Sequence, residues 1–97
     1  MKKHDIKQTT VKEIHKSDGD ATYIYRLNMK RSDRVASYQL PLYSIEIEMT
    51  TEEGYTSNET PELFSDIGRA LVFLSYLAEH LVTPLNLPYV IEDAICP

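Results

Sequence analysis

The sequence predicts a small α+β domain in which a three-stranded antiparallel sheet is packed by one long helix and followed by a short carboxy-terminal helix (β-β-β-α-α). Segments with a two-residue period occupy the first half of the chain, and one long run with a helical period follows them. A sheet covered on one face by a helix is the simplest way for such segments to bury their apolar sides. With 97 residues, no repeats and no long linker, we expect one domain over residues 1–97 that is frayed at residues 1–8.

The first two expected strands form a hairpin. Residues 9–15 are rich in β-branched side chains, and residues 21–30 alternate more clearly. Asp18-Gly19 between them is the strongest turn signal of the first half. The residues of the second strand that share its apolar face are Tyr23, Tyr25, Leu27 and Met29.

The third expected strand covers residues 36–50, after a turn at residues 31–34. Its apolar face carries Tyr43, Ile45, Ile47 and Met49. Pro41 lies inside this run and cannot donate to a ladder, so we expect an edge position or a bulge there. The polar residues 51–59 are then expected to form a connector.

The long helix is expected over residues 60–82. Thr60 could cap it with Pro61 at the first helical position, and Thr83-Pro84 would stop it. At 100° per residue, one face gathers the expected core residues Leu63, Ile67, Ala70, Leu71, Leu74, Leu77, Ala78 and Leu81.

A short second helix is expected after Asn86, which could cap it, with Pro88 tolerated in its first turn. Its apolar residues at helical spacing are Leu87, Val90, Ile91, Ala94 and Ile95.

The carboxy-terminal third carries a recognisable set of residues, Ile67, Thr83-Pro84, Leu87, Val90, Ile91, Glu92 and Asp93. With these residues it resembles a family of small uncharacterised proteins from clostridia and related Firmicutes, known only as a domain of unknown function. The resemblance implies a bacterial, cytoplasmic protein. It implies no activity and no catalytic residues, and the extra Pro88 departs from the family pattern.

Composition argues against several classes of function. The formal charge of −5 argues against nucleic-acid binding, which needs a basic surface. Cys96 is the single cysteine, which excludes an internal disulfide and fits a reducing compartment. No segment has the roughly 20 apolar residues that a membrane span requires. We therefore expect a cytoplasmic protein that binds neither membranes nor nucleic acid.

The polar residues do not predict a catalytic, cofactor or metal site. His4, His15 and His80 lack the spacing of a helical metal pair, and no glycine-rich phosphate loop is present. Glu46 and Glu48 project from the same face of one strand and could converge on a cation, so a metal-dependent hydrolase is a weak alternative. Lys12, Arg26 or Lys30 on neighbouring strands could instead pair with these carboxylates.

The seven tyrosines offer a second alternative. Tyr23, Tyr25 and Tyr43 are expected to pack in the core, but they could also line a small-ligand pocket between sheet and helix.

The far side of the long helix carries an apolar cluster where a solvated face should be polar. This cluster consists of Val72, Phe73 and Tyr76. Either the carboxy-terminal helix folds over it or it forms an interface between two copies of the chain. We predict a non-catalytic protein-interaction or regulatory module that self-associates as a homodimer through this cluster.

Overall fold

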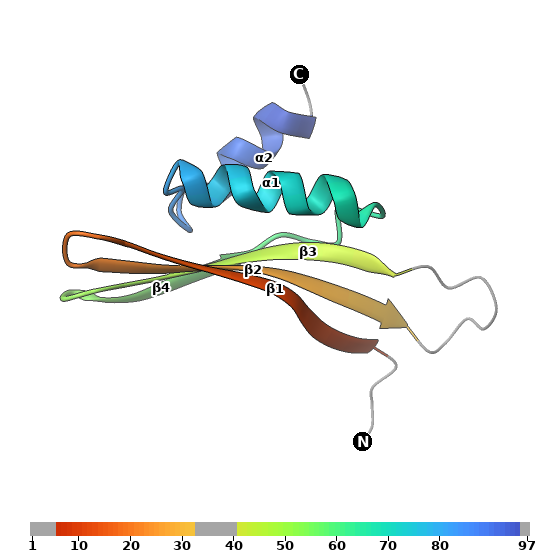
Figure 1. Ribbon diagram of the computed structural model, residues 1–97, viewed down its shortest axis with the longest axis horizontal. Coiled ribbons are helices and arrows are strands. Elements are labelled where there is room, and N and C mark those ends of the chain that lie inside the picture. The colour runs from red at the N-terminus through yellow and green to blue at the C-terminus, as the bar shows by residue number, and fades with distance from the viewer. Residues whose placement is uncertain (1–5, 33–40, 96–97) are drawn as a thin grey trace.

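The computed structural model describes residues 6–32 and 41–95, which form an α+β fold with an antiparallel sheet and two helices. The elements are β1 (Ile6–Asp18), β2 (Ala21–Ser32), β3 (Leu42–Thr51), β4 (Gly54–Glu59), α1 (Ile67–Glu79) and α2 (Leu87–Ile95). The strands lie side by side in chain order, β1-β2-β3-β4. Helix α1 covers one face of the sheet, and α2 lies beyond α1 on the side away from the sheet (Figure 1). The α+β class with two helices is confirmed, but the expected number of three strands is wrong.

The additional strand is β4, which lies in the segment expected to be a connector. It pairs with β3 from Thr51↔Gly54 to Glu46↔Glu59. As an edge strand it buries no hydrophobic side chain, and Tyr55 is 61% exposed. The strand therefore lacks the apolar alternation that would identify it in the sequence.

The expected β1–β2 hairpin is confirmed. Asp18 pairs with Ala21, and Gly19 between them has a φ of 63°, the left-handed conformation that tight hairpin turns require. Strand β1 begins at Ile6, so residues 6–8 belong to the sheet and not to a frayed end. Residues 1–5 lie outside the described part of the chain. A bulge interrupts the β1–β2 ladder between Thr10 and Lys12.

Strand β3 is a central strand. The expected start of this strand at residues 36–40 and the second half of the preceding turn, residues 33–34, lie outside the described residues. Residues 31–32 of that turn belong to β2. Pro41 immediately precedes β3, and the ladder to β2 is regular from Leu42 to Thr50. Because β3 lies between β2 and β4, the expected edge position is wrong.

Helix α1 begins later than expected because Thr60 has a different partner. The Ile45 N–H donates to Thr60 Oγ1 (3.0 Å) and the Thr60 N–H donates to the Ile45 carbonyl (2.9 Å), so Thr60 continues along β3. The helix is capped by Asp66, whose carboxylate accepts the Gly68 N–H at 2.9 Å. Thr60 as the cap is therefore a wrong prediction.

Helix α1 also ends earlier than expected, at Glu79. The Leu81 N–H donates to Ala78 O (3.2 Å) and the Val82 N–H donates to Leu77 O (3.0 Å), the two bonds of a Schellman motif. Leu81 takes the left-handed position of this motif with a φ of 51°, a position that usually holds glycine. This residue stops the helix before Thr83-Pro84.

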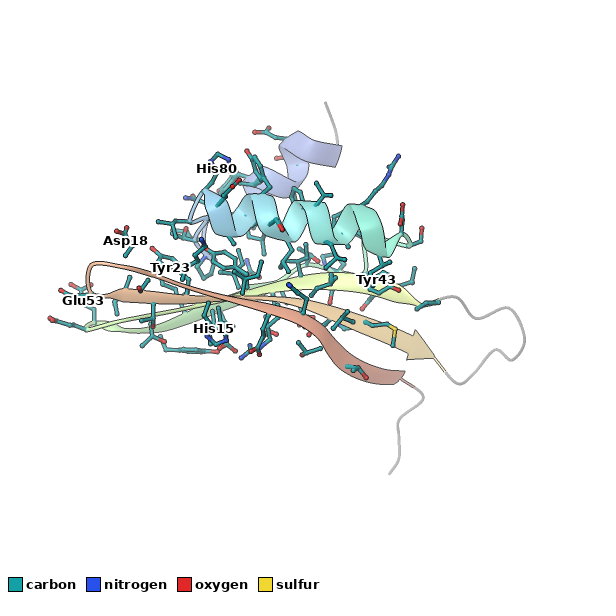
Figure 2. The ribbon with its side chains drawn as sticks, in the orientation of Figure 1. His15, Asp18, Tyr23, Tyr43, Glu53 and His80 are labelled. Atoms are coloured by element: carbon teal, nitrogen blue, oxygen red, sulfur yellow. The ribbon has the colours of Figure 1, made fainter. Side chains whose placement is uncertain are left out.

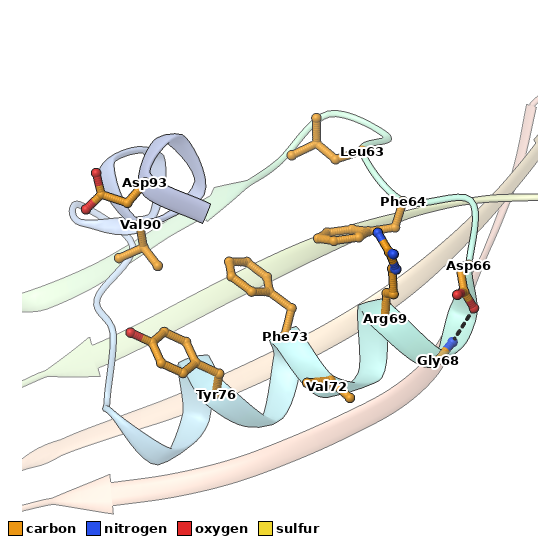
Figure 3. Close-up of a pocket in the computed structure, with 10 residues that line it drawn as sticks. All are labelled: Leu63, Phe64, Asp66, Gly68, Arg69, Val72, Phe73, Tyr76, Val90 and Asp93. Atoms are coloured by element: carbon orange, nitrogen blue, oxygen red, sulfur yellow. Dashed lines mark hydrogen bonds between the residues drawn. The ribbon is translucent and has the colours of Figure 1, made fainter. Parts of the chain in front are cut away.

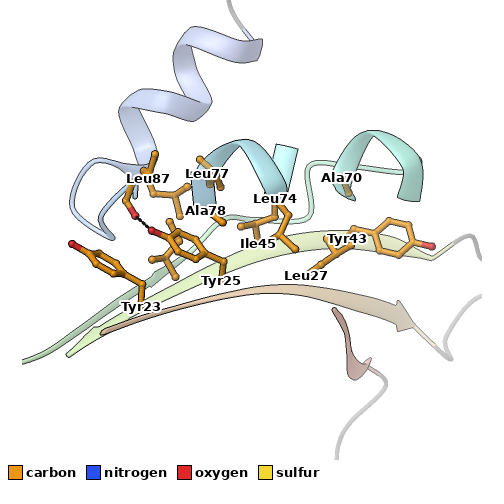
Figure 4. Close-up of a cluster of buried hydrophobic side chains, with 12 residues drawn as sticks. Tyr23, Tyr25, Leu27, Tyr43, Ile45, Ala70, Leu74, Leu77, Ala78 and Leu87 are labelled. Carbon is orange, nitrogen blue, oxygen red and sulfur yellow. Dashed lines mark hydrogen bonds between the residues drawn. The ribbon is translucent and has the colours of Figure 1, made fainter. Parts of the chain in front are cut away.

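The core lies between the sheet and α1 (Figure 4). From α1 it contains Ala70, Leu74, Leu77 and Ala78. The Tyr25 hydroxyl donates to the Val82 carbonyl at 2.9 Å and so ties β2 to the end of α1. The expected docking through Leu63 and Ile67 is wrong, because these side chains are 38% and 41% exposed.

Candidate functional site

The outward side of α1 carries the apolar cluster expected from the sequence. Since Leu74 and Leu77 point to the sheet, the helical period directs Val72 and Tyr76 away from it. Val72 is 72% exposed and Tyr76 is 47% exposed, while Phe73 is half-buried. Val72 and Tyr76 therefore form an exposed apolar surface on the side of α1 away from the sheet, and Phe73 lies at its flank, packed partly against the core.

A second wall is formed by the β4–α1 connector, residues 60–66. The Tyr43 N–H donates to Phe64 O at 2.8 Å, which holds this part of the connector against β3. The Phe64 ring lies with its centroid 5.6 Å from that of Phe73, and the Phe73 ring stacks on Tyr76 at 6.2 Å. These contacts make a continuous aromatic row from the connector to the last turn of α1.

Helix α2 provides the third wall. Its first residue, Leu87, is 1% exposed and packs at the end of the core, so α2 is anchored at its amino end. The Asn58 side chain donates to Pro84 O at 3.1 Å and fixes the preceding turn to β4. From this position α2 places Val90 and Asp93 opposite α1 (Figure 3).

The three walls enclose an open groove of about 1230 Å³, which we call the α1–α2 groove. Its lining residues are Leu63, Phe64, Asp66, Gly68, Arg69, Val72, Phe73, Tyr76, Val90 and Asp93 (Figure 3). Charged side chains occur on all three walls, with Arg69 on α1, Asp66 before it and Asp93 on α2. An apolar floor with charged residues of both signs can bind an apolar group and orient it through polar contacts.

The expected ligand-pocket tyrosines lie elsewhere. Tyr23 and Tyr43 are 7% exposed and Tyr25 is 0% exposed, all on the α1 side of the sheet. Figure 2 shows Tyr23 and Tyr43 between the sheet and α1. Burial raises the pKa of the Tyr25 hydroxyl, and the neighbouring Tyr23 adds to this effect. None of the three lines the α1–α2 groove.

Glu46 and Glu48 lie on the open face of the sheet, which α1 does not cover. They flank Arg26 of β2, which donates to Glu48 at 2.6 Å and lies 3.6 Å from Glu46. Arg26 also donates to Glu13 of β1 at 2.6 Å. The hydrogen bond from Arg26 lowers the pKa of Glu48. Of the three expected cationic partners, Arg26 is the one that the structure brings to these carboxylates.

A second ionic group on the open face surrounds Lys30 and Glu59. Lys30 lies 3.4 Å from Glu59 and 3.1 Å from Glu62. Glu59 also accepts hydrogen bonds from Ser44 (2.7 Å) and Asn28 (3.3 Å). Burial alone would raise the pKa of Glu59, but these hydrogen bonds and Lys30 lower it. The open face is thus a network in which carboxylates are held by side chains of the same sheet.

The two histidines in the described part of the chain do not come together. His15 is exposed and bonds Glu13 at 3.0 Å, whereas the His80 ring packs on Tyr76 at a centroid distance of 4.4 Å. His4 and Cys96 lie outside the described residues. Within residues 6–32 and 41–95, no group of three or more His, Cys, Asp or Glu side chains could hold a metal ion.

Sequence reasoning found Val72, Phe73 and Tyr76 but missed the connector wall. Leu63 was assigned to the core, and Phe64 was assigned no role. The connector falls between elements, where helical periodicity carries no information. The carboxy-terminal helix was one of the two expected covers of the apolar cluster. In the structure this helix, α2, forms one wall of the groove but does not cover the cluster, because Val72 and Tyr76 stay exposed.

Comparison with known proteins gives one match. Neither the search of curated proteins nor the search of solved structures returned a match. In the described part of the chain, neither helix has the length and apolar character that crossing a membrane requires. The sequence model of one family, described as a family of unknown function (DUF6514), matches residues 5–97. The match covers nearly the whole chain and confirms the resemblance to a domain of unknown function, so the chain belongs to the DUF6514 family.

Proposed function

We propose that this chain is a non-catalytic, cytoplasmic protein-interaction module that binds a second copy of itself through the α1–α2 groove. The observation that carries the proposal is the position of Val72, an aliphatic side chain 72% exposed on the wall of a groove whose lining is mostly apolar. Large apolar surfaces with charged rims are typical of protein interfaces.

The charges around the groove favour a second copy as the partner. Asp66 and Asp93 line the groove together with one basic side chain, Arg69, so the rim carries both signs. In a two-fold interface the same patch faces itself, and Arg69 of each copy can approach an acidic residue of the other. A rim of a single sign would repel its own copy, whereas this one is complementary to itself.

The polar residues outside the groove support a non-catalytic role. Glu46 and Glu48 are engaged by Arg26, and Glu59 is engaged by Ser44, Asn28 and Lys30. Carboxylates held in this way by side chains of one sheet favour a structural role for these three residues over acid–base chemistry.

The test is multi-angle light scattering of the wild type and of Val72→Glu at tens of micromolar. We expect the wild type to have twice the single-chain mass of 11.2 kDa and Val72→Glu to have the single-chain mass. A charge at the centre of an apolar interface is strongly unfavourable, but at a site 72% exposed it leaves the fold intact.

The matched control is Leu42→Glu. Leu42 is 38% exposed and pairs with Lys30 on the open face, so the new carboxylate faces a cation and lies on the face of the sheet that α1 does not cover. This variant should remain a dimer. A monomeric wild type, or dissociation by both variants, would contradict the proposal.

A further inference from the structure

Two further large apolar side chains are exposed beside the groove. Leu85, in the turn between α1 and α2, is 77% exposed, and Tyr89 of α2 is 66% exposed. Neither lines the groove of its own chain. Leu87 anchors α2 in the core, so these two side chains extend from a fixed support and not from a loose end.

The helical period places Tyr89 at the outer lip of the groove. Val90 and Asp93 face the groove, and Tyr89 lies about 40° beyond Asp93 on the α2 wheel at 100° per residue. Around the helix the order is therefore Val90, Asp93, Tyr89, from the groove outward. A molecule that approaches the groove of one copy meets Tyr89 at the same surface.

The groove is lined by residues that can bind both the ring and the hydroxyl of a tyrosine side chain. The rings of Phe64, Phe73 and Tyr76 form an aromatic row, on which another ring can stack or pack edge-on. Arg69 and Asp66 at one end of the groove could bond a phenol hydroxyl. Tyrosine has an apolar ring with a polar tip and is enriched among the residues that dominate interface energies.

We propose that Tyr89 of each copy inserts into the α1–α2 groove of the other. A two-fold dimer then contains two identical seats, each formed by the groove of one copy and Tyr89 of the other. This inference rests on the proposed self-association and names the residue that fills the groove. It explains why the groove is open in the single chain: the side chain that completes it belongs to the partner. Leu85 lies four residues before Tyr89 in the sequence and would cover the edge of the same seat.

The test begins with Tyr89→Ala, with Tyr55→Ala of β4 as the matched control because Tyr55 is 61% exposed on the sheet. Sedimentation equilibrium should show that Tyr89→Ala raises the dimer Kd by about tenfold or more, as removal of a central interface tyrosine does. Tyr55→Ala should leave the Kd unchanged. Circular dichroism of both variants should match the wild type, because both positions are exposed.

Mixing two variants distinguishes reciprocal seats from a simple contact of groove on groove. Val72→Glu has a damaged groove and an intact Tyr89, while Tyr89→Ala has an intact groove. Their mixed dimer keeps one complete seat, so an equimolar mixture should dimerise more strongly than either variant alone. Absence of this rescue would overturn the inference.

The two proposals fail in different ways. If the wild type is a dimer that Val72→Glu dissociates but Tyr89→Ala does not, the groove is the interface and Tyr89 does not fill it. If the wild type is a monomer, both the self-association and the insertion of Tyr89 into a partner's groove are refuted.

Discussion

Replacement of Leu74 by alanine should remove a large part of the stability of the domain. Leu74 is 0% exposed and lies in the core between α1 and the sheet (Figure 4). Leucine-to-alanine substitutions at fully buried sites cost about 2–5 kcal/mol, through lost transfer free energy and the cavity that remains. Domains of this size have a total free energy of unfolding of about 5–15 kcal/mol, so the loss is a substantial fraction.

The assay is urea unfolding of the wild type, Leu74→Ala and Val72→Ala, monitored by circular dichroism at one protein concentration. Val72 is two positions away on the same helix but is 72% exposed, so its replacement should cost less than about 0.5 kcal/mol within the single chain. Comparison at a concentration where light scattering shows the wild type itself to be a monomer removes any contribution from self-association. A larger cost for Val72→Ala than for Leu74→Ala would mean that α1 faces the sheet with its other side.

Three other predictions follow from local contacts. The Leu81→Gly variant should be more stable than the Leu81→Ala variant by about 1 kcal/mol in thermal or urea unfolding. Both substitutions remove the leucine side chain, but only glycine adopts a φ of 51° without strain. Equal stability of the two variants would contradict the Schellman motif. The pKa values of Glu48 and Glu59 are lowered from 4.5 in the folded state, so their contribution to stability is present above pH 4.5 and is lost as the pH falls through the lowered values. The free energy of unfolding of Glu48→Gln should therefore depend less on pH, between neutral and acidic conditions, than that of the wild type. An unchanged dependence would refute the Arg26 contact. Addition of a strong chelator should leave the midpoint of thermal unfolding unchanged, and a fall of more than a few degrees would reveal a structural metal.

The first half of the sheet could be predicted because its central strand has a strong pattern. Tyr23, Tyr25 and Leu27 occupy alternate positions, since β2 has one face in the core and the other on the open side. The open-side residues include the polar Arg26 and Asn28, and Ile24 is the exception. Strand β4 has no such pattern, because its position at the edge gives it little core to face. Its formation is decided by backbone pairing with β3, which leaves no periodic trace in side chains.

The limits of α1 were misjudged because capping residues compete. Thr60 followed by Pro61 is a good helix start by local rules, but pairing with Ile45 keeps Thr60 in the sheet layer. Asp66 is the cap that remains once the connector is held against β3. The sequence does not reveal the left-handed conformation of Leu81, because the residue that ends a helix in this conformation is ordinarily recognised as a glycine.

The groove was partly predictable. Val72 and Tyr76 break the polar character of the outer face of α1, which is visible in the sequence. Phe64 of the connector and the position of α2 could not be foreseen, because they depend on tertiary contacts at Tyr43, Asn58 and Leu87.

The central claim is that the α1–α2 groove is a self-association surface, and the most direct measurement is a concentration series of two-dimensional NMR spectra of the labelled chain. Backbone amides that change with concentration report the surface that meets the second copy. We predict changes at the lining of the groove and around Tyr89, with the amides of β1 and of the open-face residues Arg26 and Glu48 unaffected. Spectra that do not depend on concentration, or changes centred on the open face of the sheet, would contradict the claim.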